Sequence, residues 1–428
     1  MTRFASGGRQ PSAVILDRVC IPPNLVLDSA ARVFSTSAFS GWTGLFGLAP
    51  LVFAVMLWKL YRALTASPHL DGERKLDDEP ASLAVVIPAY NEAANVVACL
   101  SHVLDSTTAP IQVYLVDDCS TDDTLALAQA WADCEPDNRL KILTAPPRPA
   151  GEVWRGKNWA CAWAVERIQS DYLLFVDCDV RLQPGAIAAA WQELRDRQIG
   201  LLSVGPEIVC GCLAEWLVQP IVMAVLAAGF DLNAVNDPRC DAAFAAGPFM
   251  LFERKAYDKI GGHAAVAPEV VEDVELAKRI KHGGFGLFYG FSGGLVRARM
   301  YQDGASLWEG WTKNWFSGSG RSYLNTVYAV AALTLLFVVP WIAAIAGLLT
   351  PQPLWLGLGL VGITEQWGMR LMLRRWANLP LTYWWLSGVG GLITVSIAIA
   401  SAYRTTTGRS WTWRGRSLTT PETQTQVE

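Results

Sequence analysis

The sequence is poor in charge and has no excess of positive charge. Charged residues make up 17% of the 428 residues, hydrophobic residues make up 52%, and the net charge is -4 at pH 7. The lysines and arginines form no long block, so a nucleic-acid partner is not expected. The composition is more apolar than that of an ordinary soluble enzyme, and it predicts membrane-spanning segments.

The cysteines lack the paired spacing of a structural metal site. All nine lie between Cys20 and Cys240, and their number is odd. Cys210 and Cys212 are close enough in sequence to share a soft metal ion, but they have no matching second pair. We therefore interpret the cysteines as reduced thiols that face the cytosol. The chain also lacks an internal repeat and a low-complexity tract.

A first apolar run lies near the amino terminus. No charged residue occurs over residues 33–58, which is about the length that a bilayer crossing needs. We predict a transmembrane anchor over residues 33–64. An amino-terminal extension, residues 1–32, precedes it and sets the run too far from the start for a simple cleaved signal peptide. Arginines of the extension compete with Lys59 and Arg62, so the positive-inside rule does not orient the anchor.

A second apolar region precedes the carboxyl terminus. After Arg321 no charged residue appears until Glu365. We predict a carboxyl-terminal transmembrane region over residues 325–403, with two or three segments, followed by a basic and then polar tail over residues 404–428. The segments are a strong span over 327–349, a weaker one over 354–372 and another over 381–402. Glu365 and Gln366 weaken the middle segment, which we expect to be re-entrant or interfacial if the carboxyl terminus is cytosolic.

Between these regions, residues 67–316 form a polar domain with alternating strand and helix patterns. Buried strands are predicted at 83–88, 113–116 and 172–176, and a helical pattern follows the first of them over residues 91–104. This alternation predicts the α/β class, with a mostly parallel sheet covered by helices. One apolar stretch, residues 216–230, is too short for a confident span and is expected to be an interfacial or a core helix.

Acidic side chains follow the predicted strands, where α/β sheets bind their ligands. Asp177 and Asp179 are separated by one residue at the end of the third strand. Two such carboxylates can approach a divalent cation that bridges two phosphates. An Asp-x-Asp pair alone is common in loops, but here it continues an ordered series that includes residues 88–92 (PAYNE) and 116–122 (VDDCSTD).

In combination, these segments resemble the family 2 glycosyltransferases, which share the GT-A fold, over residues 83–316. The resemblance implies a Rossmann-like domain that binds a UDP- or GDP-sugar together with Mg2+ or Mn2+. The residues that it implies for the donor are Pro88, Tyr90, Glu92, Asp117, Asp118, Lys157 and Asp177. The metal ligands that it implies are Asp177 and Asp179. For Lys157, the alternative is a solvated loop lysine.

Glu272 and Asp273 stand where the apolar spacing predicts the start of a helix. They resemble the acidic pair of the family, in which the aspartate is the general base, so the resemblance makes Asp273 the catalytic base beside Glu272. Direct displacement at an anomeric carbon requires the incoming hydroxyl to lose a proton, which a carboxylate can accept. The alternative is that both acids only offset the dipole at the amino end of the helix.

Other segments narrow the subgroup. Residues 246–252 with 261–266, and residues 235–239, are similar to carotenoid (diaponeurosporenoate-type) and hopene-associated membrane glycosyltransferases. His263 is either an acceptor contact or a loop residue. Residues 311–315 (WTKNW) replace the Gln-x-x-Arg-Trp of processive relatives, so long-chain polysaccharide synthesis is not expected. Residues 412–416 (TWRGR) resemble a basic tail of the carotenoid enzymes, or bind anionic lipid as a juxtamembrane patch.

The sequence therefore predicts a metal-dependent, inverting hexosyltransferase in the cell membrane, multi-pass, with its catalytic domain in the cytosol. The expected acceptor is a hydroxyl of a membrane lipid, with a carotenoid or hopanoid favoured. A polyprenyl phosphate, a sphingolipid or a glycerolipid is the alternative acceptor. A membrane assembly module with a degenerate transferase domain is the alternative outside the enzymes, and a transporter is disfavoured because few confident spans are found.

Overall fold

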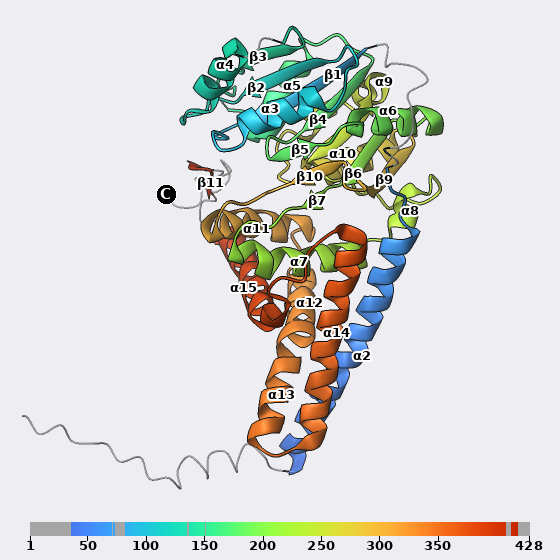
Figure 1. Cartoon of the computed structure of the whole chain (residues 1–428), viewed down its shortest axis with the longest axis vertical. Coiled ribbons are helices and arrows are strands. Elements are labelled where there is room, and N and C mark those ends of the chain that lie inside the picture. Colours follow the sequence, from blue (N-terminus) through green and yellow to red (C-terminus); the bar gives the residue numbers. More distant parts are fainter. Residues whose placement is uncertain are drawn as a thin grey trace, which may run out of the picture.

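The computed structural model describes residues 36–70, 72, 82–134, 137–149, 151–407 and 412–417. The predicted extension over residues 1–32 lies outside the described residues, as do residues 418–428 of the predicted tail. An α/β domain stands on a bundle of long apolar helices (Figure 1).

The domain is built on a seven-stranded sheet with the order β3-β2-β1-β4-β8-β6-β9. The strands are β1 (Leu83–Ala89), β2 (Gln112–Asp117), β3 (Leu140–Thr144), β4 (Tyr172–Val176), β6 (Leu201–Gly205), β8 (Phe249–Glu253) and β9 (Leu287–Phe291). Only β8 runs antiparallel to its two neighbours, and the other neighbouring pairs are parallel. The α/β class with a mostly parallel sheet is thus confirmed.

Alternate side chains along each strand point to opposite faces of the sheet, and both faces are buried. In β1, Val85 and Ile87 face one apolar cluster and Ala84 and Val86 face the other, as expected for a side-chain period of two. The first cluster includes α3 (Val96–Asp105) and α6 (Ala186–Arg197), and the second includes α5 (Gly156–Val165), α9 (Arg254–Lys259) and α10 (Glu272–His282). Because both faces are covered, the strands read as nearly continuous apolar runs.

Shorter elements complete the domain. They are α4 (Thr124–Cys134), α8 (Leu232–Asn236), the 3-10 helix η1 (Gly262–Val266), and the small sheet β5 (Val180–Leu182), β10 (Val296–Ala298) and β7 (Glu207–Ile208). The small sheet follows the Asp177–Asp179 turn directly, so it fixes the position of that turn against the rest of the domain.

The helix predicted from residue 91 begins only at Val96. Residues 91–95 form a turn, with Asn91 in the left-handed region at φ 52°. The Asn91 amide donates to Ser120 Oγ at 3.0 Å, and the Glu92 amide donates to Thr124 Oγ1 at 2.7 Å. Side chains from the loop after β2 thus accept hydrogen bonds from the backbone amides of residues 91 and 92. In the first turn of a helix, such amides would have no partner within the helix. The apolar spacing did not reveal this long-range competition.

Three helices in the described part of the chain are long and apolar enough to cross a membrane: Phe39–Ala66, Tyr323–Leu349 and Trp384–Thr406. The first belongs to α2 (Thr36–Ala66), the second comprises α12 (Tyr323–Leu333), the π-helix η2 (Thr334–Val338) and α13 (Val339–Leu349), and the third comprises the 3-10 helix η3 (Trp384–Leu386) and α15 (Ser387–Thr406). The middle segment, α14 (Pro353–Ala377), is one unbroken helix of 25 residues. It pairs with α13 and α2 in the bundle (Figure 1), so the structure does not show the break of a re-entrant segment.

Gln366 in α14 has a structural role inside this apolar bundle. Pro340 cannot donate a backbone hydrogen bond to the carbonyl four residues before it, that of Leu336. Gln366 Nε2 donates to that carbonyl at 2.9 Å and to the carbonyl of Phe337 at 3.3 Å, and Trp341 Nε1 donates to Gln366 Oε1 at 2.9 Å. The glutamine therefore satisfies backbone groups at the π-helical turn, as polar residues between membrane helices often do.

A layer of helices joins the bundle to the domain. The apolar stretch at 216–230 belongs to α7 (Leu213–Gly229), which packs against α11 (Gly304–Gly318) and α15 beneath the sheet (Figure 1). Its buried residues Leu217, Val218 and Val222 share one cluster with Trp311 and Ile397. Residues 216–230 were expected to form an interfacial or a core helix, and this packing is that of a core helix.

Candidate active site

A cavity of about 1240 Å3 opens where the carboxyl ends of β1, β2 and β4 meet. Nine of the predicted site residues line it, and they come from separate strand ends and from the starts of α5 and α10. They are Pro88, Tyr90, Glu92, Asp118, Lys157, Asp177, Asp179, Glu272 and Asp273. Parallel strands bring their carboxyl ends to one edge of a sheet, which explains why residues distant in sequence converge there.

Asp117, which was predicted with the donor residues, does not line the cavity. Its carboxylate accepts the amide of Ser120 at 3.3 Å and lies buried beneath the loop after β2. Asp118, one residue further on, faces the cavity instead. Asp117 thus shapes the loop, and the donor-binding role predicted for it stays a prediction.

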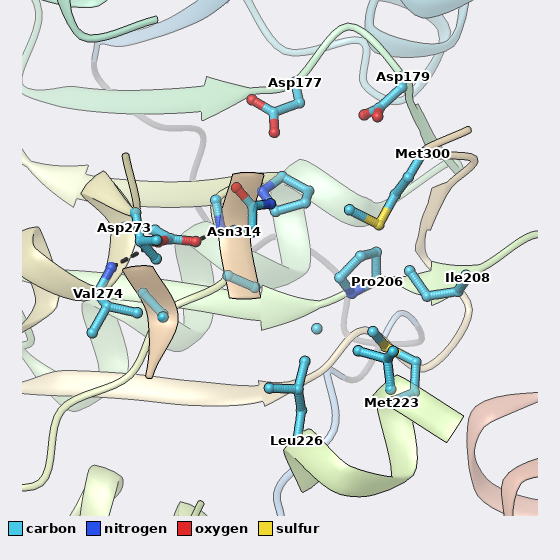
Figure 2. A pocket seen from close by; sticks show the side chains of 18 of the residues that line it. Asp177, Asp179, Pro206, Ile208, Met223, Leu226, Asp273, Val274, Met300 and Asn314 are labelled. Carbon is cyan, nitrogen blue, oxygen red and sulfur yellow. Dashed lines mark hydrogen bonds between the residues drawn. The ribbon is translucent and has the colours of Figure 1, made fainter. Parts of the chain in front are cut away.

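Asp177 and Asp179 flank a tight turn between β4 and β5, and both point into the cavity (Figure 2). Oδ1 of Asp179 is buried and has no hydrogen-bond partner within the described chain. Burial, together with the carboxylates of Asp177 and Glu92, raises the pKa of Asp179 to about 8. A buried carboxylate without a partner is costly, so this pair fits a cation.

Among the described residues, no three His, Cys, Asp or Glu side chains form a group that could hold a metal ion by themselves. Cys210 and Cys212 are free thiols outside any such group, so the soft-metal alternative gains no support.

Lys157 connects the two acidic centres from the first turn of α5. Its Nζ lies 2.7 Å from Asp177 Oδ1 and 2.8 Å from Glu272 Oε1, and it donates to the carbonyl of Gly247 at 3.3 Å. Burial alone lowers the pKa of Lys157, but the two carboxylates raise it well above its ordinary value. The side chain is therefore a fixed positive charge in the cavity and not a solvated loop lysine.

Asp273 is held at the amino end of α10. Its Oδ2 accepts the amide of Gly247 and its Oδ1 accepts the amide of Val274, both at 2.8 Å, and Figure 2 shows Asp273 beside Val274. Burial and the neighbouring Glu272 raise the pKa of Asp273 to about 7. Burial also acts to raise the pKa of Glu272, but Lys157 overcomes it and lowers that pKa. Two adjacent carboxyl groups thus have pKa values pushed apart, which is typical of a proton-transfer site.

Tyr90 and Asp118 form the far end of the cavity. Burial raises the pKa of Asp118, and Arg416 and Arg148 counteract it. The Nη2 atom of Arg148 lies 3.4 Å from Asp118 Oδ2. A side chain at Gly156 would place its Cβ 2.6 Å from the same oxygen, so any larger residue there would displace the Asp118 carboxylate or the arginines beside it.

The side of the cavity formed by α7 is lined by apolar side chains. Met223 and Leu226 of α7 face Pro206, Ile208 and Met300 below the two aspartates (Figure 2). The cavity continues past residues near the ends of α2 and α14, such as Leu64 and Leu373. One continuous space therefore joins the carboxylates to the apolar helices.

Lys313 in α11 also lines the cavity, within the segment 311–315 that differs from the processive pattern. Burial lowers the pKa of Lys313 to about 8. The helix that carries Lys313 lies beyond the strands in the sequence and reaches the cavity only through the tertiary fold.

His263 does not line the cavity. It is buried in η1, its Nδ1 lies 2.9 Å from the Tyr257 hydroxyl, and its ring lies against Phe175 with centroids 4.5 Å apart. Burial lowers the pKa of His263 to about 3, so the ring is neutral. Of the two alternatives for His263, the acceptor contact is wrong.

Comparison with known proteins agrees with this geometry. Residues 84–261 match the sequence family described as "Glycosyl transferase family 2". Two relatives from Staphylococcus aureus are both described as 4,4'-diaponeurosporenoate glycosyltransferase. The relative from strain MRSA252 is 28% identical and that from strain USA300 is 27% identical, each over 272 residues, or 62% of this chain and 68% of the relative.

Among solved structures, the chain is similar to a mannosyltransferase from Pyrobaculum calidifontis determined in complex with GDP-Man and Mn2+. The TM-score is 0.50 at 16% sequence identity, and the match covers 84% of this chain and 99% of that one. At this identity the likeness concerns the fold. Taken with the convergent strand ends, it shows that the domain whose residues 84–261 match glycosyl transferase family 2 has the GT-A fold.

Proposed function

We propose that this glycosyltransferase moves a sugar, with inversion, from a nucleotide-sugar donor to a hydroxyl group of a membrane terpenoid lipid of the carotenoid or hopanoid kind. The observation that carries the proposal is the continuous cavity, with carboxylates and cations at one end and the apolar side chains of α7 at the other. A charged donor and an apolar acceptor need such opposite environments around one reaction centre.

The acceptor class also draws on the relatives. The relatives are named for activity on 4,4'-diaponeurosporenoate, and the apolar side of the cavity lies beside helices that are long and apolar enough to cross a membrane. An acceptor could therefore remain partly in the bilayer while its head reaches Asp273. A polyprenyl phosphate, a sphingolipid or a glycerolipid is the second choice, because each also has an apolar chain and a polar head.

In this mechanism Asp273 accepts the proton of the acceptor hydroxyl as its oxygen attacks the anomeric carbon. The bond from that carbon to the diphosphate breaks, and the nucleoside diphosphate leaves. Lys157 and Lys313 provide positive charge beside the departing phosphates. A Mg2+ or Mn2+ ion held by Asp177 and Asp179 would neutralise further charge on the diphosphate when bound. Because nucleotide sugars are made in the cytosol, we place the domain on that side of a multi-pass protein.

Turnover is expected to rise with pH through about 7, because Asp273 accepts a proton only in its ionised form and burial raises its pKa to about 7. Initial rates with saturating donor, acceptor and Mn2+ between pH 5.5 and pH 9 test this. Donor binding measured over the same range separates the effect of Asp273 from that of Asp179 and Lys313, whose pKa values of about 8 affect the donor site. A rate that stays flat from pH 6 to pH 8 would contradict the assignment.

Replacing Leu226 with Glu is expected to raise the acceptor KM by about tenfold or more, because a charge on α7 would have to be desolvated against an apolar chain. The donor KM should stay near that of the wild type. Leu226→Met keeps the volume and the apolar character, so it serves as the matched control. Equal acceptor KM values for both variants would mean that the acceptor does not lie along α7.

The whole proposal is tested by incubating membranes that contain the protein with radiolabelled UDP- and GDP-sugars, with and without chelator. Mass spectrometry of the lipid extract then identifies the product. A labelled terpenoid glycoside that disappears with chelator is expected. Transfer to a polyprenyl phosphate, sphingolipid or glycerolipid would replace the acceptor class, and the absence of transfer from every donor would favour an assembly module with a degenerate domain.

A further inference from the structure

The segment that follows the last helix returns to the donor end of the cavity. Residues 412–417 form a hairpin in which β11 (Thr412–Trp413) pairs with β12 (Arg416–Ser417). Arg414 and Gly415 make the turn, with φ angles of 50° and 83°, as in the primed two-residue turns that suit tight hairpins. Both arginines of the turn region line the cavity.

Arg416 lies on two of the residues predicted for the donor, Tyr90 and Asp118. Its guanidinium carbon is 3.6 Å from the centroid of the Tyr90 ring, and its Nη2 donates to the backbone carbonyl of Asp118 at 2.7 Å. Its Nη1 forms an ion pair with the Asp118 carboxylate. The guanidinium therefore stacks on the aromatic ring and donates N–H groups to the buried acid at the same time.

Arg414 extends this contact toward the metal carboxylates. It forms an ion pair with Glu92, and its Nη1 donates to the carbonyl of Asn91 at 3.0 Å. In return, Asn91 Nδ2 donates to the carbonyl of Arg414 at 2.9 Å. On the other side, Lys313 Nζ of α11 lies 4.2 Å from the centroid of the Trp413 ring, and the Arg414 amide donates to Glu309 at 3.3 Å. The hairpin thus bridges the helix layer and the donor residues.

We propose that this hairpin closes the donor site, with Arg416 occupying the subsite of the nucleoside base until the donor displaces it. The inference rests on the function proposed above. A guanidinium is planar and presents N–H donors along its edge, and uracil and guanine are also planar and present N–H groups. One face of Tyr90 and one carboxylate of Asp118 cannot hold both occupants, so donor and hairpin bind in competition.

Competition has a measurable consequence. When a fraction of the protein has the hairpin seated, the apparent Kd of the donor increases in inverse proportion to the open fraction. Removing the contacts of Arg416 therefore tightens donor binding, although it removes a positive charge from a site that receives a diphosphate. An arginine that held the donor directly would have the opposite effect, which makes the sign of the change decisive.

The test uses the full chain in detergent with Mn2+, and calorimetry with UDP and GDP as probes. Arg416→Ala is expected to lower the Kd of the bound nucleotide by about fivefold or more. A chain that ends at Thr407 should show the same tightening. Arg404→Ala removes the same charge from the end of α15, outside the cavity lining, and should leave the Kd unchanged. Added nucleotide should also speed trypsin cleavage after Arg414 and Arg416 in the wild type.

Weaker or unchanged binding in Arg416→Ala and in the shortened chain would overturn the hairpin proposal, and so would protection of Arg416 from trypsin by the nucleotide. In either case, a wild type that binds the nucleotide and turns over a nucleotide sugar would leave the proposed function intact. If neither nucleotide binds the wild type or the variants, and no nucleotide sugar is turned over, the proposed function fails together with the inference.

Discussion

Replacing Asp273 with Asn is expected to lower turnover by about a hundredfold or more while donor affinity barely changes. The amide keeps the shape of the side chain and can still accept the amide of Gly247 through its oxygen. It cannot accept the proton of the acceptor hydroxyl. Since the base acts on the acceptor, it should contribute little to holding the donor. Initial rates and donor calorimetry in the same detergent test both parts.

Glu275 supplies a matched control for Asp273. It lies in the first turn of the same helix, its side chain is exposed, and it pairs with Lys278 on the surface. A carboxylate that only offsets the helix dipole contributes less than about 1 kcal/mol, so Glu275→Gln should keep full turnover. If Asp273→Asn also stays within a few-fold of the wild type, Asp273 leaves the mechanism. Glu272 then becomes the next base to test, or the acceptor nucleophile is a carboxylate that is already ionised.

Replacing Asp179 with Asn is expected to abolish metal-dependent donor binding and to lower turnover by on the order of a hundredfold or more. One oxygen of the carboxylate is buried and unpartnered, beside two further acids. Its negative charge therefore favours the binding of a cation. Without a cation, the same charge destabilises the folded state. Titration with Mn2+ in the presence of the nucleoside diphosphate measures the first effect, and initial rates measure the second.

The same substitution should make the metal-free protein more stable at neutral pH. Burial and the neighbouring acids raise the pKa of Asp179 to about 8 in the folded state, above the ordinary value of about 4 in an unfolded chain. The folded protein therefore binds the proton more tightly, and this contribution to stability is lost as the pH rises from about 4 through about 8. The Tm of the metal-free wild type should fall over that range, and the Tm of Asp179→Asn should fall less.

Added Mn2+ should raise the Tm of the wild type but not that of Asp179→Asn, because a ligand that binds only the folded state stabilises it. Asp122→Asn is a suitable control, since Asp122 is acidic and loop-borne and bonds to Thr124 and not to the cavity. Full activity of Asp179→Asn in metal-free buffer would remove the metal site from the mechanism.

Much of the catalytic domain follows from local patterns in the sequence. The strands ending near Pro88, Val116 and Val176 read as short apolar runs because both faces of the sheet are covered. The acids that follow them had to converge because parallel strands end at one edge. Helix α10 begins at Glu272 as its apolar spacing predicted. Each of these features depends on side chains a few residues apart or on a general rule of sheet topology.

Other features depended on partners far along the chain. Asp117 and Asp118 are indistinguishable by type, and only the direction of the strand end decided which one faces the cavity. Gln366 is a polar residue within an apolar segment, and the sequence gives no reason for it. The structure gives one, because Gln366 donates hydrogen bonds to two backbone carbonyls near Pro340. His263 lost its alternative because Tyr257 and Phe175 surround it.

The hairpin at residues 412–417 is the clearest case of a feature that only the tertiary structure decided. By itself the sequence determined a basic segment after the last apolar helix, which is equally compatible with binding anionic lipid. Asn91 and Arg414 are 323 positions apart, and no local pattern relates them. Their contact exists because α11 and α15 pack together beneath the sheet and return the end of the chain to the cavity. The packing of the helices thus determines that Arg414 pairs with Glu92 and Arg416 with Asp118. Neither segment of the sequence alone determines these pairs.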